Sequence, residues 1–334
     1  MTDKITVLVT GGGGYIGSHA VLALRDAGWP VVVLDDESNS TGVLVPADVP
    51  YVKGSIADRA LVATTLRDHR IGAIMHFAGS ILVAESVTDP LKYYRNNTQA
   101  SLVLLEEVVA AGIPHLVFSS TAAIYGAPER LPIEEGDHKL PINPYGVSKW
   151  MTEQMLADAA QVCDFNYAAL RYFNVAGADP QLRSGQIGKT STHIVKIATE
   201  AALGKRPHVD VFGVDYPTPD GSCIRDYIHV SDLAAAHVAA LEKLIERPSE
   251  NLLLNCGYGT GLSVTQVLDA LDTVVQRKIP RVIGPRRPGD PPQLVASNRA
   301  LVETLDWLPR HDDIHAIISD ALAWERKLAD GTPV

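Results

Sequence analysis

Two side chains near the middle of the chain, Tyr145 and Lys149, have the types and the spacing of an acid–base pair. They lie four residues apart in a segment expected to be helical, 144–163, so that the phenol and the ammonium group share one helix face. A phenol with its ordinary pKa near 10 is a poor base, and lowering that value by about three units requires roughly 4 kcal/mol. One cation about 4 Å away, at an effective dielectric constant near 20, supplies an energy of that order. The spacing favours a tyrosine general base, but an exposed Tyr–Lys pair on a helix has the same pattern.

Hydroxyl side chains end the strand expected just before that helix, where Ser119, Ser120 and Thr121 follow the apolar run HLVF. A hydroxyl group at this place could hydrogen-bond the substrate oxygen whose proton the tyrosinate takes. An ordinary turn of Ser and Thr residues at a strand end would have the same sequence. The order of the signals along the whole chain is what favours the catalytic interpretation.

The first signal in that order is ITVLVTGGGGYIGSH, residues 5–19, in which a short apolar strand is followed by Gly11, Gly14 and Gly17 and then by a helical pattern. A strand, a tight glycine turn and a helix N-terminus form the arrangement that binds a pyrophosphate, because glycine lets the backbone approach and the helix start attracts the anion. The alternative is an ordinary glycine-rich turn. The flanking strand and helix favour a dinucleotide site.

An acidic residue stands where a dinucleotide fold needs one. The second apolar strand, 31–34, ends in Asp35 and Asp36, about 20 residues past the glycines. A carboxylate there hydrogen-bonds the adenosine ribose hydroxyls and repels a 2′-phosphate, which predicts NAD as the cofactor. Asp35 is the better candidate because it directly follows the strand, and a pair of solvated turn acids is the alternative.

Strands and helices alternate through the first half of the chain. Further strands are expected at 51–55, 73–78, 115–120 and 167–174, and further helices at 59–69, 91–111 and 144–163. This alternation predicts an α/β fold with a doubly wound parallel sheet, the Rossmann fold, in which ligands bind at the carboxyl ends of the strands. Asp35, Gly79, the 119–121 hydroxyls and Asn174 all fall at that edge.

The elements become shorter and more irregular beyond residue 177. A polar loop is expected at 179–189, turns rich in proline at 216–221 and 286–292, and a strand that runs into a glycine-rich loop at 253–261. We therefore expect an NAD-binding domain at 1–176 and a smaller α/β substrate domain at 177–334. The apolar character of 225–245 predicts that this stretch returns to the first domain.

Composition excludes several classes of function. The formal net charge is −10 and the chain has no basic block, so nucleic acid and anionic membranes are not expected partners. The start of the chain lacks the basic and apolar segments of a secretory signal, and no apolar run reaches membrane-spanning length. Three widely spaced cysteines indicate reduced thiols. We expect a soluble cytoplasmic protein.

Long motifs extend this picture. They are TGGGGYIGSH at 10–19, HFAG at 76–79, ESVTDPLKYYRNN at 85–97, FSSTAAIYG at 118–126, PYGVSK at 144–149, RYFNVAGADP at 171–180, RDYIHVSDLA at 225–234 and RRPGDP at 286–291. Through them nearly the whole chain resembles the extended short-chain dehydrogenases/reductases, and within these the 4-epimerases of UDP-glucose and UDP-galactose. The resemblance implies reversible epimerisation at C4 through a transient 4-keto sugar and bound NADH, in galactose metabolism. It also implies a homodimer formed through the helices at 91–111 and 144–163.

The resemblance assigns roles to residues of this chain, beginning with catalysis by Thr121, Tyr145 and Lys149. It implies a cofactor site made of Gly11, Gly14, Tyr15, Ile16, Gly17, Asp35, Asn39, Ser40, Ser55, Ile56, Phe77, Ala78, Gly79, Asn96, Ser119, Tyr145, Lys149 and Phe173. It implies a UDP-sugar site made of Thr121, Tyr145, Asn174, His193, Ile194, Val211, Phe212, Arg225, Arg287, Asp290 and Leu294. Arginines suit the diphosphate because their planar fork donates to phosphate oxygens in pairs.

Some positions depart from the family pattern. Ser55 stands where the family usually has Asp, Ile81 where a lysine is frequent, and the pair His193–Ile194 where Asn–Leu is frequent. Leu294 stands at the gate that governs entry of N-acetyl sugars, and its intermediate size leaves acceptance of these sugars open.

Other functions remain as alternatives. A 4-epimerase of a UDP-N-acetylhexosamine, UDP-pentose or UDP-uronate has the same motifs. A 4,6-dehydratase would carry an Asp–Glu pair where this chain has Ala122 and Ala123, and a non-catalytic dinucleotide sensor would be expected to lose Tyr145 or Lys149.

No metal site is expected. His311 and His315 have the spacing of ligands on one helix face, but Asp312 and Asp313 between them indicate a helix cap on a solvated surface.

Overall fold

The computed structural model describes residues 4–187, 191–287 and 290–331. The chain forms two compact units by their internal contacts. The first unit comprises Met1–Gly126, Lys139–Arg171 and Ala234–Leu254, and the second comprises Ala127–His138, Tyr172–Leu233 and Asn255–Val334. The predicted domain borders remain a prediction.

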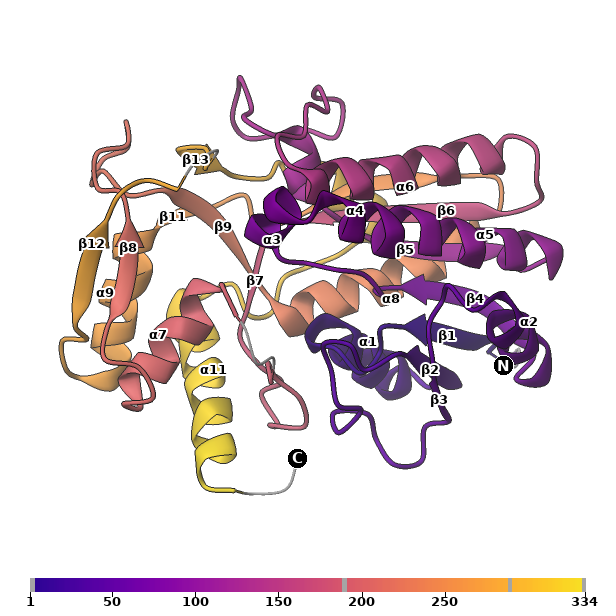
Figure 1. Ribbon diagram of the computed structural model, residues 1–334, viewed down its shortest axis with the longest axis horizontal. Coiled ribbons are helices and arrows are strands. Elements are labelled where there is room, and N and C mark those ends of the chain that lie inside the picture. Colours follow the sequence, from indigo (N-terminus) through magenta and orange to yellow (C-terminus); the bar gives the residue numbers. More distant parts are fainter. Residues whose placement is uncertain (1–3, 188–190, 288–289, 332–334) are drawn as a thin grey trace. The chain divides into compact units, whose positions relative to one another are not determined.

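A seven-stranded sheet forms the centre of the first unit, with the strand order β10-β6-β5-β4-β1-β2-β3 in the described residues (Figure 1). The strands are β1 (Thr6–Thr10), β2 (Val31–Asp35), β3 (Tyr51–Lys53), β4 (Ile71–His76), β5 (His115–Thr121), β6 (Asn166–Tyr172) and β10 (Leu252–Cys256). Strand β1 pairs in parallel with both β2 and β4, and the chain winds outward from it in two directions. This is the predicted doubly wound parallel sheet, and the comparisons given below confirm it.

Helices cover the sheet of the first unit because its strands are apolar on both faces. They are α1 (Tyr15–Asp26), α2 (Arg59–Asp68), α3 (Val83–Thr88), α4 (Pro90–Tyr93), α5 (Ala100–Ala110), α6 (Pro144–Ala160) and α8 (Val230–Glu246). Leu104 of α5 and Leu156 of α6 join Leu8, Ile74 and Leu116 of the strands in one buried cluster. The alternate strand residues, such as Val7 and Val9, are fully buried outside that cluster.

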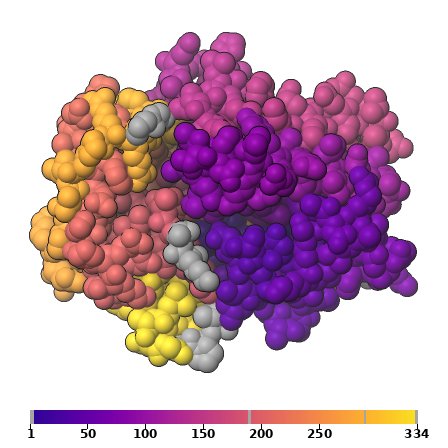
Figure 2. Space-filling view, viewed as in Figure 1, coloured from indigo at the N-terminus to yellow at the C-terminus, as the bar shows by residue number. Residues whose placement is uncertain are grey.

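The helix predicted at 91–111 is not regular. It is composed of α4, a π-helical turn at Tyr94–Gln99 and α5. The cause lies in polar side chains beside the backbone, since the carbonyl oxygen of Asn97 accepts hydrogen bonds from the hydroxyls of Ser101 and Thr152. These hydroxyls compete with the backbone for the carbonyl oxygen and widen the turn. Figure 2 shows the surface of α3 to α5 in violet. Val87 of α3 and Leu91 of α4 are exposed.

Other predicted boundaries were also wrong. The strands expected at 51–55 and 73–78 lie at Tyr51–Lys53 and Ile71–His76. The helix expected at 144–163 ends at Ala160. The strand expected at 167–174 ends at Tyr172, and Asn174–Ala176 forms a separate strand, β7, that pairs in parallel with β9 (Ile224–His229) of the second unit. A pairing between strands 50 residues apart leaves no local pattern from which the break could be predicted.

The described residues of the second unit form two small sheets. Strand β9 pairs with β11 (Gly261–Ser263), β13 (Gln293–Leu294) and β7, while β8 (Val209–Phe212) pairs with β12 (Arg281–Gly284). Helices α7 (Ile194–Ala202), α9 (Val264–Val275) and α11 (Ile314–Ala329) pack against one another (Figure 1), and α10 (Arg299–Leu305) precedes α11. Their shared core includes Val195, Leu268, Ile318 and Val211.

In the described residues, the model contains no helix that is both long and apolar enough to cross a membrane.

Candidate active site

Tyr145 and Lys149 both lie in the first two turns of α6, a helix whose start is well defined by the sequence. Asn143 caps it by accepting a hydrogen bond from the amide of Gly146 at 2.8 Å, and Pro144 occupies the first helical position. The two side chains are only 6% and 4% exposed. An exposed Tyr–Lys pair is therefore excluded, and both groups face the protein interior.

The Lys149 ammonium group is fixed against the end of β5. Its Nζ donates a hydrogen bond to the carbonyl oxygen of Ser119 at 3.1 Å and lies 4.9 Å from the centre of the Phe118 ring. Burial lowers the pKa of Lys149 to about 8, so the side chain is still mostly charged at neutral pH. Burial, together with the charge of Lys149, lowers the pKa of His76 to about 3, and this imidazole stays neutral between the hydroxyls of Thr10 and Ser101.

Thr121 ends β5 and begins a short 3-10 helix, Ala122–Tyr125. Its hydroxyl oxygen accepts a hydrogen bond from the amide of Ala123 at 3.1 Å. A hydroxyl that accepts from the backbone keeps its own proton as a donor. Thr121 can therefore cap the strand-end turn and, at the same time, donate a hydrogen bond to a substrate oxygen.

Asn97 belongs to the same site, although sequence reasoning did not single it out. It lies in the π-helical turn, 2% exposed, and its amide nitrogen donates to the hydroxyl of Ser148 and to the carbonyl of Ser80, both at 3.0 Å. A Cβ placed on Gly79 would lie 2.9 Å from the Asn97 side-chain oxygen and 3.8 Å from the Lys149 Nζ. The structure thus brings the predicted Gly79 beside Lys149. The only signal in the sequence was a polar Asn–Asn pair in an expected helix.

The glycine turn allows no side chains at two of its positions. A Cβ on Gly11, whose φ is +72°, would lie 2.6 Å from the amide nitrogen of Ala78. A Cβ on Gly17 would lie 2.2 Å from the carbonyl oxygen of Gly11. Helix α1 begins at Tyr15 after a glycine N-cap, Gly14, and its first turn, which includes the predicted Ile16, is uncharged. A close backbone approach and an uncharged helix start fit the pyrophosphate of NAD.

Asp35 is not a solvated turn acid, because it is 7% exposed. Its carboxylate accepts hydrogen bonds from the amide of Gly13 at 2.9 Å, from the amide of Glu37 at 2.8 Å and from the hydroxyl of Ser40 at 2.8 Å. The residue thus joins the glycine turn to the loop after β2, at the place where NAD binding needs an acceptor for ribose hydroxyls. This donor and acceptor set fits the adenosine half of NAD.

The remaining predicted cofactor residues of the first unit lie at strand and helix ends. Phe77 and Ala78 follow β4, and the Phe77 ring packs at 4.8 Å from the ring of His237. Asn96 donates a hydrogen bond to the Ser80 hydroxyl at 3.0 Å. The Ser55 hydroxyl accepts from Ala57 at 3.2 Å, whereas Asn39 is exposed and Ile56 is buried in the core.

Predicted sugar residues of the second unit gather in two places. Asn174, His193 and Ile194 line one pocket together with Tyr227. Burial lowers the pKa of His193, which keeps this imidazole neutral near pH 7. Phe173, half-buried, precedes β7.

The second place is formed by β8, β9, β13 and the loop between β12 and β13. Arg225 on β9 forms an ion pair with Asp290, and Leu294 on β13 pairs with Arg225 in the sheet register. Val211 and Phe212 end β8, and the Arg287 guanidinium group stacks 4.0 Å from the centre of the Phe212 ring. Stacking holds the planar donor fork of Arg287 in one orientation, as recognition of a phosphate requires.

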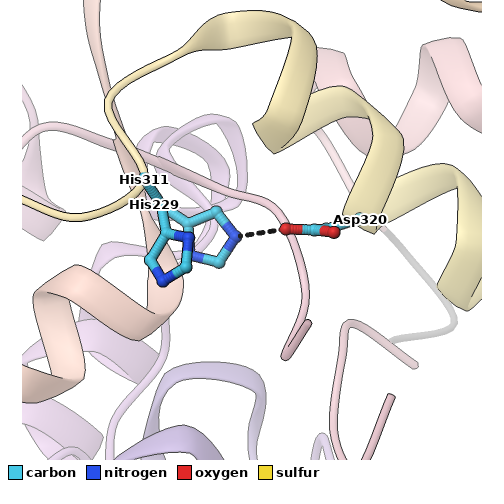
Figure 3. Close-up of side chains that lie close together, drawn as sticks. All are labelled: His229, His311 and Asp320. Atoms are coloured by element: carbon cyan, nitrogen blue, oxygen red, sulfur yellow. Dashed lines mark hydrogen bonds and ion pairs between the residues drawn. The ribbon is translucent and has the colours of Figure 1, made fainter. Parts of the chain in front are cut away.

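His229, His311 and Asp320 of the second unit lie close together (Figure 3), with ligand atoms within 4.8 Å of one another. The Nδ1 atom of His229 accepts a hydrogen bond from the amide of Ser231 at 3.0 Å, so the proton of the neutral ring is on Nε2, which donates to Asp320 at 3.3 Å. Both ring nitrogens are thereby used, whereas a metal ligand must offer a free lone pair. Hydrogen bonding accounts for this cluster, and the predicted absence of a metal stays a prediction.

His315, the second histidine of the pair considered in the sequence, lies at the start of a helix as predicted. Asp313 is the N-cap of α11, and it accepts a hydrogen bond from the amide of His315 at 3.1 Å. His315 contacts Asp313, whereas the His311 ring stacks on His229 with ring centres 4.6 Å apart.

Comparisons with known proteins agree with this geometry. The model of the NAD dependent epimerase/dehydratase family matches residues 7–257. The chain is 55% identical to the UDP-glucose 4-epimerase of Azospirillum brasilense, over 98% of this chain and 95% of that protein. The crystal structure of UDP-glucose 4-epimerase from Stenotrophomonas maltophila, with bound NAD and formylated UDP-arabinopyranose, has a TM-score of 0.93 and 38% identity, over 98% of this chain and 100% of that chain. The structure of the Bifidobacterium longum UDP-glucose 4-epimerase, in complex with NAD+ and UDP, has a TM-score of 0.92 and 35% identity, over 98% and 99%.

Proposed function

This chain belongs to the NAD dependent epimerase/dehydratase family, and we propose that it interconverts UDP-galactose and UDP-glucose at C4 with NAD as its cofactor. The observation that carries the proposal is the buried pair Tyr145 and Lys149 beside the hydroxyl end of β5. The names of its relatives support it, and so do the ligands of two solved relatives, which are NAD with formylated UDP-arabinopyranose in one and NAD+ with UDP in the other. Bound NAD supplies the acceptor and donor of the C4 hydride.

The residues of the first unit have distinct parts in the proposed reaction. The Tyr145 phenolate takes the proton of the sugar 4-hydroxyl group, and the Thr121 hydroxyl shares that hydrogen bond. The charge of Lys149 favours the phenolate, while the carbonyl of Ser119 fixes the position of that charge at 3.1 Å. Tyr145 would return that proton to the same oxygen when the 4-keto sugar is reduced on its opposite face. The glycine turn around Gly11 holds the pyrophosphate of the cofactor.

The second unit is proposed to hold the UDP-sugar. Arg225 and Arg287 donate to the diphosphate, and the ion pair with Asp290 orients the first of them. The Asn174 amide and the neutral His193 ring offer hydrogen bonds in one pocket without adding a charge. Leu294 as a gate for N-acetyl sugars remains a prediction.

Replacing Tyr145 by Phe tests the role of the base. The change removes one oxygen and keeps the ring against Tyr93, at 6.4 Å between ring centres, so the fold should persist. We expect kcat for UDP-galactose to fall by about 10²- to 10⁴-fold, with NAD content unchanged. Tyr167→Phe, at a buried tyrosine in the core of β6, is the matched control and should keep wild-type kcat. More than a tenth of wild-type activity in Tyr145→Phe would contradict the assignment.

We also propose that the protein is a cytoplasmic homodimer associated through α5 and α6. Helix α6 packs against α5 and against the π-helical turn before it, in which Thr98 contacts Met151 at 4.0 Å. Leu102 of α5 and Met151 of α6 expose 41% and 42% of their surface. All three cysteines are free, as suits a reducing compartment. Sedimentation should show a dimer at micromolar concentration, which Leu102→Glu together with Met151→Glu should dissociate; a wild-type monomer would refute the dimer.

A further inference from the structure

A buried ion pair lies beneath the candidate catalytic groups. The side chains of Glu153 on α6 and Arg171 on β6 are both 2% exposed, and they are joined by bonds of 2.7 Å (Nη2 to Oε2) and 3.1 Å (Nε to Oε1). Arg171 also donates to the hydroxyl of Tyr125 at 2.8 Å. Removing two charges from water is expensive, and a buried pair often stabilises no better than apolar residues of similar size. Stability alone therefore does not explain why this ion pair is present in the core.

The Glu153 carboxylate has a second partner, the hydroxyl of Ser120, which donates to its Oε1 atom. Ser120 is fully buried and stands between Ser119 and Thr121 on β5. Because neighbouring strand residues point to opposite faces, Ser120 is directed away from the face that carries the Thr121 side chain. Glu153 therefore binds the catalytic end of β5 through the residue that precedes Thr121.

The position of Glu153 along α6 completes the arrangement. It lies one helical turn after Lys149 and two turns after Tyr145. Lys149 binds the Ser119 carbonyl, and Glu153 binds the next residue of β5, Ser120. Successive turns of α6 are thus attached to successive residues of β5, first through the Ser119 carbonyl and then through the Ser120 hydroxyl.

We propose that Glu153 is a positioning residue that fixes α6 against β5, so that the phenol of Tyr145 and the hydroxyl of Thr121 meet the same substrate oxygen. This inference rests on the proposed function. Proton transfer depends on the distance and orientation between the Tyr145 phenol on α6 and the Thr121 hydroxyl on β5. A displacement of about 1 Å lowers a rate by up to about 10²-fold.

Ser120→Ala tests the proposal with little risk to the fold. Glu153→Gln would set an amide N–H group against the guanidinium group of Arg171 and could prevent folding, whereas Ser120→Ala leaves the ion pair intact. We expect kcat to fall about tenfold while KM and NAD content stay within twofold of wild type, and we expect Ser120→Thr to restore most of kcat. The matched control is Thr65→Val, which removes a buried hydroxyl bonded at 2.8 Å to Leu61 in α2 and should leave kcat unchanged.

The outcomes separate the two proposals. Hydrogen exchange of the amides at 119–121 needs no turnover, and it should be faster in Ser120→Ala than in wild type. Unchanged exchange would refute the attachment itself, even if wild-type protein did not act on UDP-galactose. Unchanged kcat in Ser120→Ala, or an equal loss in Thr65→Val, would refute the positioning role and leave the epimerase proposal standing.

Discussion

Replacing Gly17 by Ala should weaken NAD binding far more than it weakens the fold. The added Cβ would lie 2.2 Å from the carbonyl oxygen of Gly11 and 2.9 Å from the Cα of Gly12. Ordinary contacts begin above 3 Å, so the glycine turn and the start of α1 must separate by about 1 Å. Overpacking of this kind costs about 1–3 kcal/mol. The same displacement moves the amides that meet the pyrophosphate, and an equal loss of binding energy is about a 5- to 150-fold loss of NAD affinity.

The control lies at the other end of the same helix. Gly28 has a φ of +77°, and a Cβ there meets no atom of the described residues within 4 Å. Gly28→Ala should therefore lower the free energy of unfolding by about 1–2 kcal/mol through backbone strain alone, with NAD affinity unchanged. Titration calorimetry on cofactor-free protein gives the NAD affinity, and urea unfolding gives the stability. Wild-type affinity in Gly17→Ala, or equal losses of affinity in both variants, would refute the role of the turn.

Two further predictions concern pH. Burial lowers the pKa of Lys149 to about 8, so the cation that favours the phenolate is present below that pH and kcat should fall as the pH rises through 8; a flat kcat between pH 7 and 9.5 would contradict this. Burial raises the pKa of Asp226 to about 6, although three backbone amides donate hydrogen bonds to its carboxylate. Between about pH 4 and pH 6, the folded state therefore keeps a proton on Asp226 that the unfolded state does not hold. The stabilising effect is complete below pH 4 and is lost as the pH rises through 6. The free energy of unfolding of Asp226→Asn, relative to wild type, should therefore rise across that window by up to about 3 kcal/mol, and a constant difference in urea unfolding would refute it.

Local patterns in the sequence were sufficient for much of the first unit. The apolar strand, glycine turn and helix at 5–19 lie as predicted, because each depends on neighbours in the chain. The spacing of Tyr145 and Lys149 predicted one helix face, and the structure has both on the buried side of α6. Their roles in catalysis stay predictions.

Features that depend on distant partners could not be predicted in this way. The π-helical turn arises where Asn97 meets Thr152, 55 residues later in the chain. The Glu153 carboxylate is paired with Arg171 of β6, 18 residues later in the chain, whereas the sequence around Glu153 does not distinguish it from a solvated helix residue. His311 has the spacing of a metal ligand relative to His315, four residues away, but its ring stacks on His229 from a different element. The periodicity of a sequence does not indicate contacts between residues that are far apart in the chain.

The most direct test of the proposed function uses purified protein without added cofactor. UDP-galactose is supplied and the formation of UDP-glucose is followed, with a parallel sample that contains NAD. We expect conversion in both samples if NAD is retained on purification, and in the second sample alone if it is not. No conversion in either sample would contradict the central claim, and conversion of UDP-xylose or UDP-N-acetylglucosamine instead would keep the family and overturn the substrate.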